Sequence, residues 1–179
     1  MPRTPWEKIQ TTIRKRSHSD VEEQANLRVA EGLFNFVSEK AIVGRRHDIF
    51  PLQLGIGTKV VFWQPVILTV DERATIPFLD PRRAKRLTAQ GRRFVFSMMH
   101  ERIRAADPDF ADVSLAIVQF ALSEKGPRIP VLFSDTGVEL FTFEELDQMV
   151  GETYEMWREV CEERTVEARR RGATGGGLF

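Results

Sequence analysis

The residues best placed to do chemistry lie between positions 71 and 104, where a carboxylate precedes a run of cations. Asp80 directly follows the apolar run Ile76-Pro77-Phe78-Leu79, which predicts a strand. The basic residues after it are Arg82, Arg83, Lys85, Arg86, Arg92 and Arg93. A strand-end carboxylate facing a basic helix is typical of sites that handle phosphate groups. The same pattern is also common in surface ion pairs, and the alternative that Asp80 caps the next helix and pairs with an arginine stays open.

Charge is unevenly distributed along the chain, although the formal net charge is zero. Residues 1–106 carry 19 Lys and Arg against 11 Asp and Glu, whereas residues 107–179 carry 7 against 15. The first half, which also holds Arg45 and Arg46, could therefore meet a polyanion. Attraction between the two halves within one fold is the alternative.

Composition predicts one globular domain in a reducing, cytoplasmic setting. The 179 residues are 42% hydrophobic and 29% charged, which is ordinary for a globular protein. Cys161 is the one cysteine, so neither an intramolecular disulfide nor a cysteine-based zinc cage can form. No apolar run approaches the ~20 residues of a membrane span, and the first residues do not resemble a signal peptide.

Helices are predicted over residues 20–40, over residues 83–106, and from residue 143 onward. Asp20 is the expected N-cap of the first, and Gly32 within it weakens the helix unless it allows close packing on a sheet. Gly91 is a predicted break in the second helix. Thr142 followed by Glu145 has the spacing of a capping box for the third. An apolar stripe, expected to lie in the core, follows in that helix: Leu146, Met149, Val150, Tyr154, Trp157 and Cys161.

Strands are predicted at residues 41–43, 59–70, 74–79, 113–122, 128–133 and 137–142, with two hairpins among them. Asp71-Glu72-Arg73 supplies the turn of the first hairpin, and residues 134–137 supply the turn of the second. Pro65 implies an edge position or a bulge. The fold class is therefore α+β or α/β, a single domain with a central mixed sheet flanked by three main helices. The predicted organisation is a flexible arm at 1–19, a globular domain at 20–165 and a disordered Arg/Gly-rich tail at 166–179.

The order of these elements over about residues 25–122 resembles the restriction-endonuclease-like core of the PD-(D/E)xK nuclease superfamily. In that family a strand-end Asp and a Glu-x-Lys on the next strand bind a divalent metal, and a Glu on the first helix often joins them. The resemblance implies that Asp80 and Glu31 are catalytic and metal-binding carboxylates, with Mg²⁺ as cofactor if the site is active. Gln119 would be a peripheral polar group. No Glu-x-Lys follows Asp80-Pro81-Arg82, which implies a catalytically degenerate site.

The leading hypothesis is a nucleic-acid-binding or processing protein whose cations contact DNA or RNA phosphates. Its proposed contact residues are Arg45, Arg46, Arg82, Arg83, Lys85, Arg86, Arg92 and Arg93. The first alternative is a non-enzymatic interaction or adaptor subunit that offers a protein partner its acidic last helix or its tail, which ends in Leu178-Phe179. A Mg²⁺-dependent nuclease is the second alternative.

Overall fold

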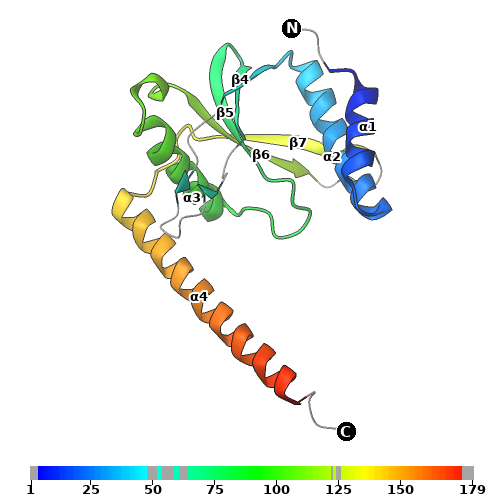
Figure 1. The fold of residues 1–179 in the computed structure, drawn as a ribbon. Coiled ribbons are helices and arrows are strands. Elements are labelled where there is room, and N and C mark those ends of the chain that lie inside the picture. Colours follow the sequence, from blue (N-terminus) through cyan, green and yellow to red (C-terminus); the bar gives the residue numbers. More distant parts are fainter. Residues whose placement is uncertain are drawn as a thin grey trace. The chain divides into compact units, whose positions relative to one another are not determined.

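The computed structural model describes residues 4–47, 52–53, 59–60, 64–121, 123 and 126–174 (Figure 1). The chain divides into two compact units, Met1–Leu140 and Phe141–Phe179. The first unit contains α1 (Trp6–Arg16), α2 (Asp20–Glu39), β1 (Val43–Arg46), β2 (Leu52–Gln53), β3 (Lys59–Val60), β4 (Val66–Val70), β5 (Arg73–Leu79), α3 (Ala89–Met99), the π-helical turn η1 (His100–Arg104), the 3-10 turn η2 (Pro108–Phe110), β6 (Ser114–Ala121) and β7 (Ile129–Ser134). The second unit contains α4 (Phe143–Thr174).

The first unit is built on a five-stranded mixed sheet with the order β1-β4-β5-β6-β7. Strands β5 and β6 run parallel, and the connection between them contains α3. The other neighbouring strands are antiparallel. The mixed sheet with its accompanying helices confirms the predicted α+β class.

The first predicted hairpin is confirmed and the second is wrong. Asp71 and Glu72 join β4 to β5 with positive φ angles of 47° and 63°, as a tight hairpin turn requires. The second hairpin instead pairs β6 with β7, and residues 138–142 form no strand. The main-chain carbonyls of Glu139 and Leu140 accept hydrogen bonds from the Arg93 guanidinium, so a side chain satisfies this segment in place of a sheet ladder.

Two prolines lie in or beside the first hairpin without breaking its hydrogen-bond ladder. Pro65 lies before β4 begins at Val66, so it disrupts no ladder, and β4 is an inner strand, not the predicted edge. Pro77 lies inside β5, beyond the last register pair with β4 at Thr75. Its carbonyl still accepts a hydrogen bond from the Gln64 N–H. A proline therefore fits an inner strand where the ladder on one side has already ended.

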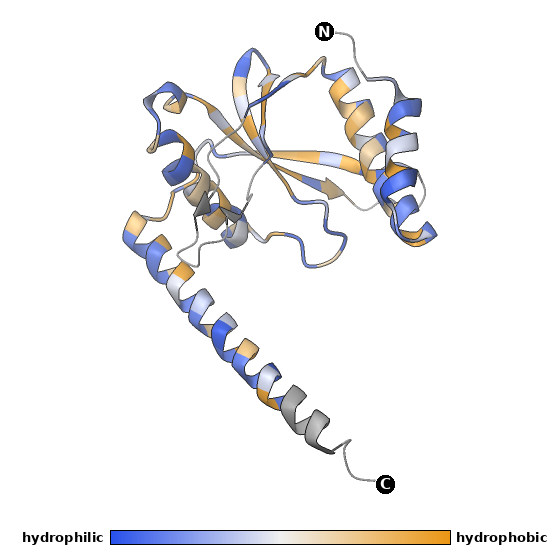
Figure 2. Ribbon diagram, viewed as in Figure 1, coloured by the Kyte–Doolittle hydropathy of each residue, from blue (hydrophilic) through white to orange (hydrophobic). Residues whose placement is uncertain are grey.

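The core of the first unit lies where α3 packs on β6. Side chains of Ile76, Phe96, Met99, Ile117 and Phe120 are at most 1% exposed. Strand β6 is buried from Leu115 to Phe120, which explains its nearly continuous apolar sequence. Figure 2 shows this as hydrophobic colouring along the central strands.

The N-terminal helices differ from prediction in two respects. Helix α1 forms inside the segment predicted as an arm, and the Trp6 ring packs at a 42° tilt against Phe34 of α2 with ring centroids 5.5 Å apart. Ser19, not Asp20, is the N-cap of α2, because its side chain accepts the Glu22 N–H at 3.2 Å. Gly32 does allow a close approach: a Cβ atom there would lie 1.7 Å from the main-chain oxygen of Arg128.

Helix α3 begins six residues later than predicted, at Ala89. The Thr88 hydroxyl accepts the Gly91 N–H at 3.1 Å, so Gly91 belongs to the first turn and does not break the helix. Residues 81–88 form an irregular loop before it. Four of the predicted phosphate ligands, Arg82, Arg83, Lys85 and Arg86, therefore lie on a loop and not on a basic helix.

In the second unit, α4 begins at the predicted capping box. The Thr142 N–H donates to the Glu145 carboxylate at 2.8 Å, and the Glu145 N–H donates to the Thr142 hydroxyl at 3.2 Å. The prediction that the whole apolar stripe lies in the core is wrong, since Tyr154 is 39% and Trp157 is 55% exposed. The helix continues to Thr174, past the predicted start of the tail. The predicted domain boundaries at 19/20 and 165/166 stay predictions.

Candidate functional site

Asp80, the carboxylate singled out by the sequence, lies buried at the end of β5 and is surrounded by donors. Its side chain is 1% exposed. Oδ1 accepts the Arg82 Nε–H at 2.6 Å, and Oδ2 accepts the Leu87 N–H at 3.0 Å and the Gln119 amide at 2.9 Å. The Asp80 main-chain N–H donates to the Val118 carbonyl of β6. Asp80 therefore ties the loop of residues 81–88 to β5 and β6, and the ion-pair alternative is what the structure shows.

These contacts keep Asp80 ionised. Burial alone would raise its pKa, because a charged carboxylate is poorly solvated away from water. The hydrogen bonds from Arg82, Leu87 and Gln119, together with the positive charge of Arg82, outweigh burial and lower the pKa to about 2. Asp80 is consequently a fixed negative charge at neutral pH and a poor candidate for proton transfer.

Gln119 extends the Asp80 network to α3. Its amide nitrogen donates to Asp80 and to the Leu87 carbonyl, and its amide oxygen accepts from Arg92 at 3.2 Å. The Arg92 guanidinium also lies 4.1 Å from the centroid of the Phe133 ring on β7. Gln119 is thus a central member of the network and not the peripheral group that the resemblance implied.

A second set of arginines satisfies main-chain carbonyls around the end of the β6–β7 hairpin. Arg28 of α2 donates to the carbonyls of Gly126 and Ser123 at 2.7 and 2.5 Å. Arg86 donates to the Phe120 carbonyl at 2.7 Å, and Arg128 donates to the carbonyls of Pro81 and Arg82. Burial lowers the pKa of Arg128, and the nearby charges of Arg86, Arg28 and Arg83 lower it further.

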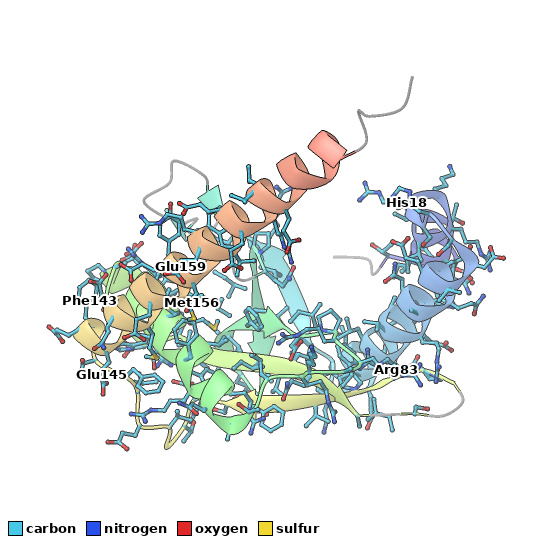
Figure 3. The ribbon with its side chains drawn as sticks, turned by 90° about the horizontal axis from the view of Figure 1, so that it is seen from below. His18, Arg83, Phe143, Glu145, Met156 and Glu159 are labelled. Atoms are coloured by element: carbon cyan, nitrogen blue, oxygen red, sulfur yellow. The ribbon has the colours of Figure 1, made fainter. Side chains whose placement is uncertain are left out.

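The arginines predicted to bind phosphates are largely used inside the protein. Arg82 pairs with Asp80, and Arg86, Arg92 and Arg93 donate to main-chain oxygens. Arg83 and Lys85 are exposed on the same loop, and Figure 3 labels Arg83. Arg45 and Arg46 lie elsewhere, on the edge strand β1, where they line an open groove with Val43, His47 and Ile67. The structure does not gather the eight predicted ligands on one helix face.

The metal-binding role predicted for Asp80 and Glu31 stays a prediction, and the hydrogen bonds to Asp80 oppose it. Both oxygens of Asp80 already accept hydrogen bonds, so a metal ion would have to displace Arg82 or the Leu87 and Gln119 donors. Glu31 lies half-buried on α2. Within the described ranges, no cluster of three or more His, Cys, Asp or Glu side chains could hold a metal ion. We derive no metal-dependent chemistry from these residues.

A different kind of surface occurs on α4. Met156, Trp157 and Val160 are 57%, 55% and 44% exposed, and Tyr154 stacks on Trp157 with ring centroids 5.8 Å apart. Large exposed apolar side chains in a cluster commonly mark a protein-interaction surface. Figure 3 labels Phe143, Glu145, Met156 and Glu159 along this helix.

Comparison with known proteins decides between these readings. A family model described as "Sliding clamp-binding bacterial toxin SocB" matches residues 1–167. The chain is also 40% identical over 174 residues to the DNA replication inhibitor toxin SocB of Caulobacter vibrioides (strain NA1000 / CB15N). That alignment covers 97% of this chain and 72% of the relative. The chain belongs to the SocB family. No solved structure matches it.

Membership in the SocB family overturns the sequence-based reading of function. The restriction-endonuclease-like assignment is wrong, and with it the leading hypothesis of a DNA-binding or nucleic-acid-processing protein. The physical reason lies in the arginines. A run of cations in sequence predicts phosphate binding only if their charged groups are free to meet a ligand, but Arg82 pairs with Asp80, and Arg86, Arg92 and Arg93 donate to main-chain carbonyls. The family description names a protein partner, which favours the interaction-subunit alternative.

Sequence reasoning missed the residues that organise the first unit. Arg128 is 9% exposed and contacts the Pro81 and Arg82 carbonyls across 47 and 46 positions, and no local pattern indicates such a pairing. Gln119 offered one signal, since it is the single polar side chain between Leu115 and Ala121 of β6. A lone amide in a buried strand requires polar partners, and Asp80 and Arg92 provide them. In the part of the chain that the structure describes, no helix is long and apolar enough to cross a membrane.

Proposed function

We propose that this protein binds the bacterial sliding clamp and thereby inhibits DNA replication. The observation that carries the proposal is the family match over residues 1–167, together with 40% identity to a DNA replication inhibitor toxin. The structure supports an interaction protein in a second way, because the polar cluster around Asp80 is saturated by internal hydrogen bonds and offers no reactive group. The cytoplasmic location expected from the sequence is compatible with such a target and stays a prediction.

We place the clamp contact within residues 1–167, the span that the family model matches. The predicted docking peptide Leu178-Phe179 lies outside both this span and the described residues. Removal of residues 172–179 is therefore expected to leave the affinity for the clamp within about twofold. A loss of binding on truncation would move the contact to the tail.

Two measurements test the proposal directly. The purified full chain is titrated into the sliding clamp of the same bacterium by isothermal calorimetry, with saturable binding as the expected result. Induction of the chain in that bacterium is then expected to stop incorporation of labelled thymidine before total protein synthesis falls. The absence of clamp binding, or a block of protein synthesis that precedes the block of DNA synthesis, would contradict the proposal.

A further inference from the structure

Helix α4 carries an exposed apolar stripe that continues through several turns. Leu146, Val150, Tyr154, Trp157 and Cys161 follow one another at spacings of three and four residues, which places them on one side of the helix. Leu146 is buried, Val150 and Cys161 are half-buried, and Trp157 is 55% exposed. The exposed members of the stripe are therefore Tyr154 and Trp157, in the middle of the helix.

In the middle of this stripe, Tyr154 and Trp157 form a preorganised aromatic pair. The rings of Tyr154 and Trp157 are stacked with an interplanar angle of 27°. Val160 and Met156 extend the apolar area on the same stretch, at 44% and 57% exposure. Aromatic side chains provide large contact areas for little lost conformational freedom, and exposed Trp and Tyr are characteristic centres of protein interfaces. We define Tyr154, Met156, Trp157 and Val160 as the α4 platform.

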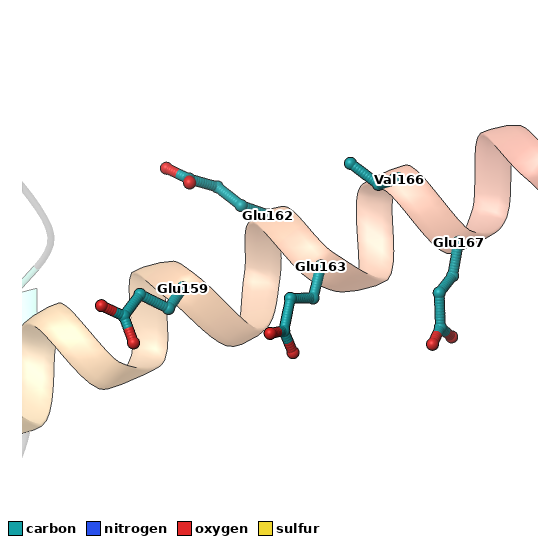
Figure 4. Close-up of a pocket in the computed structure, with 5 residues that line it drawn as sticks. All are labelled: Glu159, Glu162, Glu163, Val166 and Glu167. Atoms are coloured by element: carbon teal, nitrogen blue, oxygen red, sulfur yellow. The ribbon is translucent and has the colours of Figure 1, made fainter.

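The remainder of the helix is strongly acidic. Between residues 143 and 167 there are nine acidic side chains and two basic ones, Arg158 and Arg164. Glu159 lies three residues after Met156 and Glu163 lies three residues after Val160, so both lie beside the platform. Figure 4 shows Glu162 on the same side of the helix as Val166, which is 46% exposed, and Glu163 and Glu167 on the opposite side.

Charge complementarity determines which occupant fits this surface. A second copy of α4 would bring two helices with the same excess of carboxylates together, and the repulsion would oppose burial of the platform. An anionic lipid surface would be repelled for the same reason. A helix with apolar residues on one side and Lys or Arg along its edges would bury Trp157 and neutralise the flanking glutamates at the same time.

We propose that the α4 platform is a docking surface for a basic amphipathic helix of a second polypeptide, distinct from the sliding clamp. From Tyr154 to Glu163 the platform and its flanking carboxylates span about 14 Å at ~1.5 Å per residue, which suits a partner helix of two to three turns. This assignment goes beyond the proposed function and does not depend on it, because it rests on the exposure and charge of α4 alone.

The test uses two synthetic helical peptides with the same leucine stripe, one flanked by lysine and arginine and the other by glutamate. The full chain is titrated with each peptide at 50 and 300 mM salt while bound fraction is measured by fluorescence anisotropy. We expect the basic peptide to bind at least tenfold more tightly than the acidic one, with an affinity that falls as salt rises. Equal binding of both peptides, or no saturable binding of the basic peptide, would overturn the proposal.

Three variants separate the apolar and the charged contributions. The triple change Tyr154→Ala, Trp157→Ala and Val160→Ala is expected to weaken the basic peptide at least tenfold. The double change Glu159→Gln and Glu163→Gln keeps the side-chain shape and should weaken it about threefold. Val21→Ala removes an exposed apolar residue of α2, 82% exposed, and serves as the matched control with unchanged affinity. Circular dichroism verifies that each variant keeps its helix content.

Two further outcomes would assign the platform to another occupant and so overturn the proposal. Loss of clamp binding in the triple variant, with Val21→Ala unaffected, would mean that the clamp occupies the platform. A concentration-dependent doubling of mass in sedimentation, abolished by the triple variant, would mean that a second copy does. If the wild-type chain does not bind the clamp at all, the proposed function fails while the peptide result still decides this inference.

Discussion

The polar network around Asp80 and the surface of α4 are both rich in charge, yet their charges serve opposite purposes. Around Asp80 the guanidinium groups of Arg82 and Arg92 bond to a buried carboxylate, an amide and main-chain oxygens. On α4 nine carboxylates face solvent beside an exposed tryptophan. Charged groups that satisfy one another stabilise a fold, whereas charges on an exposed face beside apolar surface provide partner selectivity. Density of charge in a sequence therefore does not by itself indicate a binding surface.

Asp80→Ala is expected to show the largest difference in stability between the Asp80 network and α4. This change removes the acceptor of Arg82, Leu87 and Gln119 and leaves buried donors unpaired, so the free energy of unfolding should fall by about 3 kcal/mol. Urea denaturation measures the difference. Arg83→Ala, an exposed cation on the same loop, is the control and should cost less than about 0.5 kcal/mol. If both changes lowered the free energy of unfolding equally, the Asp80 network would not stabilise the fold more than an exposed cation does.

Matched glycine substitutions contrast close packing in the first unit with open helix surface in the second. Gly32→Ala would place a Cβ atom 1.7 Å from the Arg128 oxygen, so the chain must shift and stability should fall by about 2 kcal/mol. A Cβ atom at Gly151 has no heavy atom within 4 Å among the described residues. Gly151→Ala should therefore stabilise α4 by ~0.5–1 kcal/mol through helix propensity. Thermal unfolding of both variants checks the opposite signs.

Acid unfolding provides a third comparison. The folded-state pKa of Asp80 is lowered from 3.8 to about 2, so its contribution to stability is complete above pH ~4 and is lost as the pH falls toward 2. At ~1.4 kcal/mol per pKa unit, the contribution amounts to about 2 kcal/mol. Stability of the wild type minus that of Asp80→Asn, measured at intervals from pH 5 to pH 2, should shrink across this window. A difference that does not change with pH would refute the linkage.

The smallest effect on folding is expected at the α4 platform. Trp157→Ala should change the free energy of unfolding by less than about 0.5 kcal/mol, because a side chain that is 55% exposed loses little burial on truncation. Phe120→Ala, in the core of β6 and fully buried, should cost about 3–5 kcal/mol. A cost above 2 kcal/mol at Trp157 would mean that the platform is part of the folding core and not an interaction surface.

Local signals predicted several parts of the fold correctly. Thr142 and Glu145 form their capping box, and Asp71-Glu72 forms its hairpin turn, since both depend on contacts within a few residues. Close packing at Gly32 was one of two alternatives that the sequence left open, and the structure shows it against the main-chain oxygen of Arg128. The second hairpin failed because residues 137–142 have strand-like composition but receive their hydrogen bonds from Arg93, which lies 46 positions away from Glu139.

The site itself was predictable only in part. Asp80 was identified from its position at a strand end, and its pairing with an arginine was one of the alternatives considered. Which donors surround it was not predictable, because Gln119 is 39 positions from Asp80 and meets it through the parallel pairing of β5 with β6. The function suggested by the arginine run failed for the same reason, as Arg86 and Arg93 bond to carbonyl oxygens 34 and 46 positions away.

The sequence by itself determined the elements whose hydrogen bonds and apolar contacts are local: the buried strand β6, the β4–β5 turn, the start of α4 and the spacing of its apolar stripe. The tertiary structure decided which of those apolar and charged residues are used internally. It buried Asp80 among donors, directed Arg28, Arg86 and Arg128 onto main-chain oxygens, and left Trp157 exposed. Exposure depends on which distant segments pack together, and periodicity along one segment carries no information about that.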